Sequence, residues 1–287
     1  MGLRVARGLP PQVRLLALTS SAERVPELRD HGITPLQGNL DHPGTLARLA
    51  GLATRVVHLA PPPTEGKAAP GGGPAQWWRD PRTVALLRAL RQRTPPGSMV
   101  YGSTSGVYGD CGGDKVTEAR PVRPHTPRAQ RRVDAERAVR HFGRAAHVRA
   151  SILRIPGIYA PDREGGTPRE RLHKGTPVLE AADDVYTNHI HADDLARAVI
   201  AALWRGKPQR VVHASDDTEL KMGDYFDLAA DLYGLPRPPR VPRTTAQDAM
   251  SLMLLSFMSE SRRLDNARLK RELRLRLWYP TVASGLL

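Results

Sequence analysis

The sequence predicts an α/β protein, in which a doubly wound parallel sheet is followed by a smaller, mostly helical C-terminal lobe. In the first half, short apolar runs typical of buried strands alternate with helix-like segments of about ten to fifteen residues, as in a parallel sheet covered on both faces. From residue 161 this alternation loosens, and the proline-rich stretch LPRPPRVPR at 235–243 interrupts regular structure. We therefore expect a sheet domain over 1–160, to which 186–215 return, and a C-terminal lobe made of 161–185 and 216–287.

Six segments are expected to be strands of this sheet, and TRVVHLA (54–60) among them has the continuous apolar character of a strand buried on both faces. The six segments are 13–19, 33–39, 54–60, the first part of 98–109, 148–159 and 210–215.

The helix-like segments lie between these strands and after them. Gly32 and Gly234 are placed to end two of them, and Leu86, Leu87 and Leu90 form an apolar face on another. The predicted helices are 1–9, 21–32, 42–51, 76–93, 128–142, 193–204, 222–234 and much of the last forty residues.

Composition excludes several classes of protein. Hydrophobic residues make up 40% of the 287, enough for a sizeable core, and a single cysteine, Cys111, allows no internal disulfide, as expected of a cytoplasmic protein. No apolar run reaches the roughly 18 residues of a membrane span. The net charge of +14 is spread along the chain and only 5% of residues are aromatic. We therefore expect neither a membrane nor a nucleic-acid partner.

Small and hydroxyl-bearing residues follow five of the predicted strands. In an open parallel sheet, ligands bind beyond the carboxyl ends of the strands, so these residues are the candidates for a site. The segments are LTSSAER (18–24), GNLD (38–41), HLAPPP (58–63), STSGVYGD (103–110) and RIPGIY (154–159).

The order of these segments resembles a known family, the extended short-chain dehydrogenase/reductases, also called NAD-dependent epimerase/dehydratases. The resemblance rests on HLA, STSGVYG, RIPGIYAP and NHIHADDLARAV, and it covers almost the whole chain. VYGDCGGDKVTEARPV and SFMSESRRLDNARLKREL are similar to the atypical branch of that superfamily. The resemblance implies a Rossmann-type domain holding a nicotinamide cofactor, with a C-terminal lobe that covers a substrate, often a sugar nucleotide.

The resemblance also assigns roles to individual residues. Thr104, with Ser105 beside it, would hydrogen-bond the reacting hydroxyl or carbonyl; the alternative is that Thr104 only finishes a strand. At the end of the first of these strands, TSS (19–21) stands in place of an acidic residue that would bind the ribose of NAD. Ser20, Ser21 and the nearby Arg24 suit the 2′-phosphate of NADP slightly better. The full set of expected cofactor-binding residues is Gly2, Thr19, Ser20, Ser21, Arg24, Asn39, Leu40, Leu59, Ala60, Pro61, Arg132 and Pro156.

The first departure from the family pattern is at the N-terminus. The family opens with a strand and a glycine-rich turn that brings the cofactor pyrophosphate to a helix N-terminus. MGLRVARGL resembles the helix after that turn, with Gly2 as its last glycine. The first strand would lie in the middle of the sheet, so its loss leaves backbone groups unpaired on both sides. We expect a start codon assigned too far downstream rather than a degenerate copy, and weak NAD(P) binding by the chain as numbered.

The second departure is at the catalytic tyrosine and lysine, whose positions hold Arg128 and Arg132. Arginine stays protonated and is a poor general acid or base, although Arg132 suits a ribose or phosphate. The alternative is that both arginines face solvent. No tyrosine occurs between Tyr108 and Tyr159, so any proton transfer falls to another group. His125 is the best candidate because histidine titrates near neutrality; the alternative is a structural role for this loop histidine.

The C-terminal segment SESRRLDNARLKREL supplies the remaining candidates. Its arginines are expected at the start of a helix, where Arg262 or Arg263 would face the cleft and bind an anionic group; the alternative is a solvated basic helix face. For NHIH with the following DD we expect a structural role and no metal site.

Two functions remain open from sequence. The first is an NAD(P)-dependent oxidoreductase or epimerase acting on a small polar substrate. The second is a non-catalytic nucleotide-binding or scaffold protein. A homodimer through 76–93 and 128–142 is expected by analogy with the family.

Overall fold

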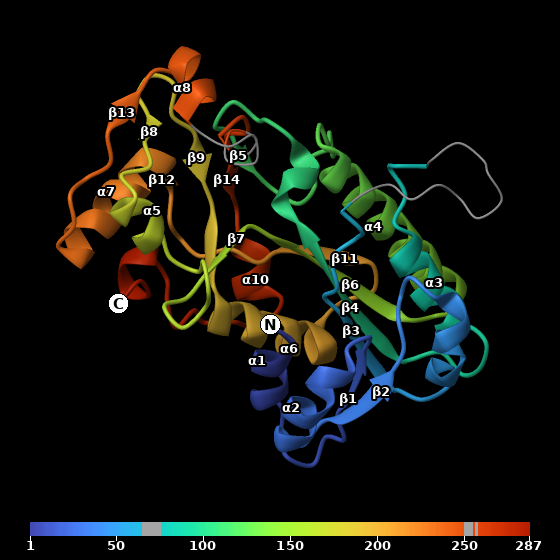
Figure 1. Cartoon of the computed structure of the whole chain (residues 1–287). Helices are drawn as coiled ribbons and strands as arrows, with labels where there is room; N and C mark the ends of the chain where they lie inside the picture. Colours follow the sequence, from blue (N-terminus) through green and yellow to red (C-terminus); the bar gives the residue numbers. More distant parts are fainter. Residues whose placement is uncertain (65–75, 250–254, 256–257) are drawn as a thin grey trace.

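The computed structural model of the chain describes residues 1–64, 76–249, 255 and 258–287 (Figure 1). Residues 65–75, most of the loop predicted after the third strand, lie outside this part. Within the described residues, no helix is both long and apolar enough to cross a membrane.

A four-stranded parallel sheet forms the centre of the molecule, with the strand order β11-β6-β4-β3. Its two middle strands are buried along nearly their whole length, because the apolar residues of SMVYGST and RASILRI are covered on both faces. The strands are β3 (Arg55–His58), β4 (Ser98–Thr104), β6 (Arg149–Ile155) and β11 (Arg210–His213).

The first two strands form a separate parallel sheet. β1 (Leu16–Thr19) pairs with β2 (Thr34–Gln37), in the register Leu16 to Thr34. In the part of the chain that the structure describes, neither strand pairs with the four-stranded sheet. The predicted parallel α/β fold is therefore confirmed. Its strands form two sheets, one with β1 and β2 and one that includes β3.

Helices cover both faces of the four-stranded sheet (Figure 1). Met99 and Tyr101 of β4 pack against the apolar sides of α3 and α4, whereas Val100 between them packs against α6 on the opposite face. The helices of these two layers are α3 (Pro81–Leu90) and α4 (Pro127–Ala145) on one face, and α1 (Gly2–Arg7), α6 (Ala192–Arg205) and α10 (Ala267–Arg271) on the other.

Side chains from the predicted turns begin these helices. Asp80 accepts hydrogen bonds from the amides of Arg82 and Thr83, and Thr126 accepts one from Ala129. The side chain of His191 caps α6 in the same way. Asp194 accepts hydrogen bonds from Arg197 and from the amides of Trp278 and Tyr279. The segment NHIH and the aspartates that follow it therefore have a structural role.

A second hydrophobic cluster lies in the C-terminal part, around Leu179, Phe226 and Met258. Short strand pairs accompany its helices: β8 with β13, β9 with β12, β10 with β7 and β14 with β5. The helices are α5 (Arg169–His173), α7 (Met222–Tyr233) and α8 (Arg243–Ala249). The short strands are β5 (Lys115–Val116), β7 (Gly157–Tyr159), β8 (Val178–Leu179), β9 (Tyr186–Thr187), β10 (His189–His191), β12 (Leu220–Lys221), β13 (Arg240–Val241) and β14 (Arg263–Leu264).

Three predicted helices differ from the structure. The segment 21–32 divides into a 3₁₀ turn, Ala22–Arg24, and α2 (Val25–Asp30), because Pro26 is tolerated only in the first turn of a helix. The segment 42–51 is a 3₁₀ helix, Pro43–Leu49, and 76–93 shortens to α3, which begins after Asp80.

The prediction that the last forty residues are helical was wrong for most of those described. Beyond α8 the described helical residues are Leu255, those of α10 and those of the 3₁₀ turn Val282–Ser284. Arg262 and Arg263 do not begin a helix: Arg263 starts β14, which pairs with β5, and the helix follows at Ala267. Pairing with a distant strand therefore determines the conformation here in place of local helix propensity.

Candidate active site

The carboxyl end of β4 carries the two residues predicted to hold the reacting group. Thr104 is the last residue of the strand, and its Oγ1 accepts a hydrogen bond from the amide of Gly106 at 3.3 Å. Ser105 is buried and opens a 3₁₀ turn, Ser105–Tyr108. Both hydroxyls therefore lie at the edge where parallel sheets bind ligands.

A carboxylate from the C-terminal part lies at the same turn, and sequence analysis missed it. A Cβ placed on Gly106 would lie 3.8 Å from Glu260 Oε2 and 3.7 Å from Thr104 Oγ1. The Glu260 side chain is only 11% exposed and forms an ion pair with Arg262, in which Arg262 Nη1 lies 2.8 Å from Glu260 Oε2. No local pattern could predict this meeting, because more than 150 residues separate Gly106 from Glu260.

Arg262 is buried and points toward this turn, in keeping with one of the two predicted alternatives. Its Nη1 donates to the carbonyl of Gly109 and to Glu260, both at 2.8 Å, while its Nε is buried without a partner among the described residues. Asn188 holds the segment in place by bonding the carbonyl of Arg262 and the amide of Leu264.

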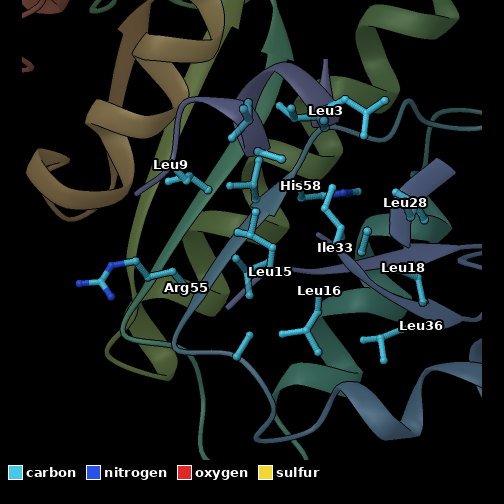
Figure 2. Close-up of a pocket in the computed structure, with 18 of the residues that line it drawn as sticks. Leu3, Leu9, Leu15, Leu16, Leu18, Leu28, Ile33, Leu36, Arg55 and His58 are labelled. Atoms are coloured by element: carbon cyan, nitrogen blue, oxygen red, sulfur yellow. The ribbon is translucent and has the colours of Figure 1, made fainter. Parts of the chain in front are cut away.

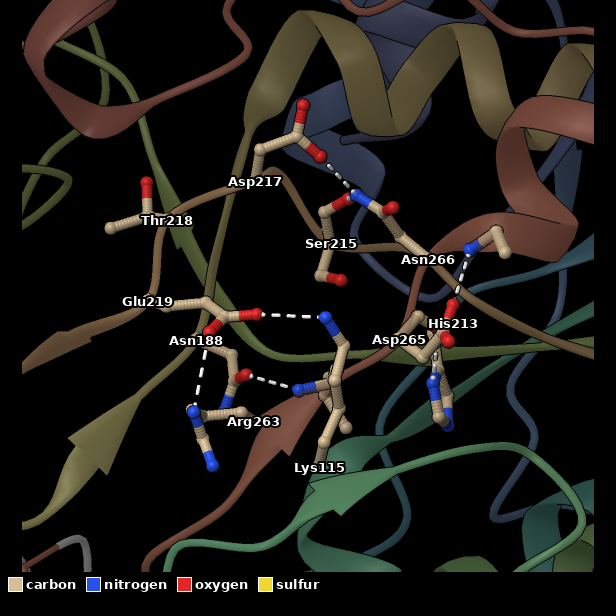
Figure 3. A network of polar contacts seen from close by, with 12 residues as sticks. Lys115, Asn188, His213, Ser215, Asp217, Thr218, Glu219, Arg263, Asp265 and Asn266 are labelled. Atoms are coloured by element: carbon tan, nitrogen blue, oxygen red, sulfur yellow. Dashed lines mark hydrogen bonds and ion pairs between the residues drawn. The ribbon is translucent and has the colours of Figure 1, made fainter.

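The Arg263 side chain binds other partners than those of the Thr104 turn. Its Nε donates to the carbonyl of Gly113, its Nη1 lies 3.4 Å from Glu219, and its guanidinium lies over the ring of Tyr186. Figure 3 shows Arg263 and Lys115 on either side of Glu219. The structure thus brings Arg262, but not Arg263, to the Thr104 turn.

The two arginines at the tyrosine and lysine positions differ in exposure. Arg128 is exposed, as expected of a solvated side chain, whereas Arg132 is buried. Arg132 Nη1 donates to the carbonyl of Gly102 at 2.6 Å and to the Tyr101 hydroxyl at 3.2 Å, and its Nε is buried without a partner among the described residues. The alternative interpretation, in which both arginines face solvent, therefore fails for Arg132.

His125 lies exposed in the loop before α4. Its ring lies against Gly109, where a Cβ would collide with it, and Gly109 has a φ of +68°. Glycine is therefore required at this position, both for its backbone conformation and for the approach of the histidine.

Tyr108 belongs to a buried network rather than to the site. Its hydroxyl receives a 2.6 Å hydrogen bond from Arg154 and lies 2.5 Å from His213 Nε2; His213 Nδ1 lies 2.8 Å from the carbonyl of Asp265. These partners indicate that Nδ1 carries the histidine proton and that the tyrosine donates to Nε2. Burial raises the pKa of Tyr108 to about 12 and lowers that of His213 to about 3.

The predicted cofactor residues are divided between the two sheets. After β1, Thr19 Oγ1 bonds with Ser21, Ser20 is exposed, and Arg24 pairs with Glu27; after β2, Asn39 holds the amide of Asp41. Leu40 also follows β2. The other sheet carries the remaining cofactor residues of the strand ends and of α4: Leu59, Ala60, Pro61, Arg132 and Pro156.

Arg82 connects the two groups. It forms a two-point ion pair with Asp41, at 2.9 and 2.7 Å, and donates to the carbonyl of Pro61. Gly2 lies at the start of α1 and lines a hollow between the two sheets (Figure 2). Arg4 of the same helix donates hydrogen bonds to the carboxylates of Asp162 and Asp193.

The fold is that of a parallel α/β protein with helices on both faces of the sheet, and comparison with known families assigns it further. The chain belongs to the NAD dependent epimerase/dehydratase family, whose model matches residues 4–214. The structure and this match together confirm the family predicted from sequence.

Among curated proteins, the chain is similar to dTDP-glucose 4,6-dehydratase of Mycobacterium tuberculosis, at 27% identity over 212 residues. These cover 71% of this chain and 63% of the relative, so the chain matches less than two thirds of that protein.

Among solved structures, a conserved protein of unknown function from Silicibacter pomeroyi matches with a TM-score of 0.78 at 27% identity, covering 99% of this chain and 92% of that one. UDP-glucuronic acid 4-epimerase from Bacillus cereus, in complex with NAD, matches with a TM-score of 0.74 at 15% identity, covering 99% and 92%. The second likeness shows the fold alone.

Proposed function

We propose that the protein uses a nicotinamide cofactor to oxidise, reduce or epimerise a small polar substrate of the sugar-nucleotide class. The observation that carries the proposal is the Thr104 turn, where the Thr104 hydroxyl at the end of a parallel strand lies near the buried Glu260–Arg262 pair. Two named relatives, a dTDP-glucose dehydratase and a UDP-glucuronic acid epimerase, act on sugar nucleotides, which supports this substrate class.

At two places in the structure, the residues present suit the proposed cofactor. The Ser20 hydroxyl and the Arg24 guanidinium are exposed at the end of β1, where a 2′-phosphate would find both a hydrogen-bond donor and a charge. The unpartnered Nε of Arg132 lies beneath the end of β4, within the group expected to hold the nicotinamide ribose. NADP therefore remains the favoured cofactor, and when bound it supplies hydride transfer.

The proton must come from a group other than a tyrosine. Arg128 is exposed but offers no proton at working pH, and burial together with the Arg154 contact leaves Tyr108 unsuited to the task. We assign proton transfer to His125, which is exposed beside Gly109 in the loop that leads into α4. Arg262 would meet the anionic part of the substrate.

The test is turnover at millimolar NAD or NADP, with dTDP-glucose and UDP-glucuronic acid as first substrates and mass spectrometry of the products. We expect a product whose mass or retention differs from the substrate, lost in Thr104→Ala. Binding of cofactor with no product from a wide panel of sugar nucleotides would favour the scaffold function instead, in agreement with the arginines at positions 128 and 132. Self-association through α3 and α4 stays a prediction.

A further inference from the structure

A hollow of about 480 Å³ lies at the β11 edge of the four-stranded sheet. Residues of α4, of β11, of α10 and of the loop after β5 line it, and β11 is an edge strand, because its one partner in the described structure is β6. Among the described residues, those predicted to hold cofactor or substrate do not line this hollow. It is therefore separate from the candidate active site.

Charge is the main feature of the lining. Six arginines and two glutamates are among the residues around the hollow. Both glutamates are buried and paired: Arg154 bonds with Glu136, and Arg268 Nε lies 3.3 Å from Glu118. The two acids of the lining therefore leave no negative charge for the other arginines.

Two more arginines of the lining pair with carboxylates that lie outside it. Arg210 Nε donates to Glu272 at 2.8 Å, and Arg120 Nη1 donates to Asp114 at 2.9 Å. Four of the six guanidinium groups thus have a counter-charge, and the positive charge that remains belongs to Arg137 and Arg140 of α4.

Arg137 and Arg140 have neither an ion pair nor a side-chain hydrogen bond in the described structure. Arg137 is exposed and Arg140 is half-buried. Residues three apart on a helix are neighbours, so the two guanidinium groups share one face of α4, where like charges repel each other. An anion bound between them would remove that repulsion.

The size and the apolar part of the hollow indicate what kind of anion fits. A volume of about 480 Å³ lies within the roughly 300–1,000 Å³ of small-molecule pockets. Ala119, Val122 and Val133 supply apolar lining beside the arginines. Guanidinium groups bind phosphate oxygens through paired hydrogen bonds, which a lysine does not match.

We propose that this hollow binds a small organic phosphate, with its phosphate group on Arg137 and Arg140 and its apolar part against Val122 and Val133. The site is concave and confined to a few arginines, so it suits a small molecule better than a long polyanion. The proposal does not depend on the proposed function, because it uses none of the residues assigned to that function.

The direct test is calorimetric titration of the 287-residue chain with phenyl phosphate, at a constant ionic strength of about 0.15 M. We expect saturable binding that weakens by at least about tenfold in Arg137→Gln with Arg140→Gln, which removes both charged contacts. Inorganic phosphate should bind more weakly, because it lacks the apolar part. Unchanged affinity in the double variant would overturn the proposal, and equal affinity for both ligands would refute its apolar part.

A matched control is Arg88→Gln with Arg91→Gln, which removes two exposed arginines at the same spacing from the end of α3. Glutamine is close to arginine in helix propensity, so both double variants should fold. Without ligand, the thermal midpoint of the Arg137–Arg140 variant should be unchanged or higher, since a repulsion is removed. Equal weakening of phenyl phosphate binding by both double variants would indicate general electrostatic attraction and overturn the proposal.

Hydrogen exchange locates the bound ligand. We expect slower exchange of the amides of 133–141 when phenyl phosphate is bound. Slower exchange at 103–110 with no change in 133–141 would place the ligand at the Thr104 turn and overturn the proposal. Binding at 133–141 in a chain that turns over no sugar nucleotide would support this site and count against the proposed function, so the two failures are distinguishable.

Discussion

Thr104 is the residue on which the proposed chemistry depends most. Its hydroxyl ends β4 and lies near Glu260, and among the described residues its one hydrogen bond is the 3.3 Å contact from the amide of Gly106. The hydroxyl is therefore available to a substrate oxygen. Thr104→Ala should lower kcat by roughly 10²-fold, the lower range of a positioned acid–base or hydrogen-bonding group, whereas Thr104→Ser should retain most activity.

Steady-state kinetics of the two variants checks this prediction, with cofactor affinity as the control. Equal kcat for Thr104→Ala and the wild type would remove the proposed site. His125→Ala should also lower kcat, and an unchanged pH–rate profile in that variant would reassign the proton transfer.

Asp216 links stability to pH. Only 4% exposed, it holds the amide of Thr218, and burial raises its pKa to about 7 from the usual value near 4. The folded state therefore holds this proton between about pH 4 and pH 7 when the unfolded state does not, so the contribution of Asp216 to the free energy of unfolding falls as pH rises through that range.

Urea unfolding of Asp216→Asn beside the wild type tests this. The wild type should lose stability relative to the variant between pH 4 and pH 7, and the difference should stay constant above that range. The comparison between variants is needed because burial lowers the pKa of His58 and His189 to about 4, which changes stability in the opposite direction in acid. A constant difference from pH 4 to pH 8 would contradict the prediction.

At the scale of elements, a buried ion pair joins α4 to the sheet. Glu136 of α4 receives two hydrogen bonds from Arg154 of β6, at 3.1 and 2.8 Å, and one from Ser103 of β4 at 2.6 Å. Both charged side chains are 5% exposed. Glu136→Leu leaves the arginine buried without its counter-charge, so it should cost about 3–5 kcal/mol of unfolding free energy.

Denaturant unfolding measures that cost. The exposed pair Arg24–Glu27 provides the control, and Glu27→Gln should change stability by less than about 1 kcal/mol. The double variant Glu136→Leu with Arg154→Met should recover much of the loss. A loss of less than 1 kcal/mol in Glu136→Leu alone would show that the pair contributes little.

Elements with strong local signals could be predicted from sequence. The strands β4 and β6 lie within continuous apolar runs, and α7 ends at Gly234, which adopts the left-handed conformation. Elements determined by distant partners could not. The segment that holds Arg262 and Arg263 has helix-forming residues, but β14 pairs with β5 about 150 residues earlier in the chain.

The candidate site shows the same limit. Thr104 and Ser105 could be found because a strand end is visible in sequence, and Arg262 was one of two candidates. Glu260 could not be found, since its place beside Gly106 follows from how the C-terminal part packs on the sheet. The buried position of Arg132 also needed the structure, because its partners are a backbone carbonyl and the Tyr101 hydroxyl.

At the scale of the whole molecule, we expect the division into two sheets to set how well the proposed cofactor binds. Residues expected to hold one end of the dinucleotide follow β1, and those expected to hold the other follow β3 and β4, with the Arg82–Asp41 pair between the groups. A binding site whose parts can move relative to one another loses affinity to the cost of ordering them.

Calorimetric titration of NADPH and NADH into the 287-residue chain, with cofactor up to millimolar concentration, therefore tests the account most directly. The divided sheet predicts dissociation constants in the millimolar range, with NADPH the tighter of the two because of Ser20 and Arg24. Low-micromolar binding of either cofactor by the chain would contradict the account, because it would show that two groups of residues on separate sheets bind the cofactor tightly as they stand.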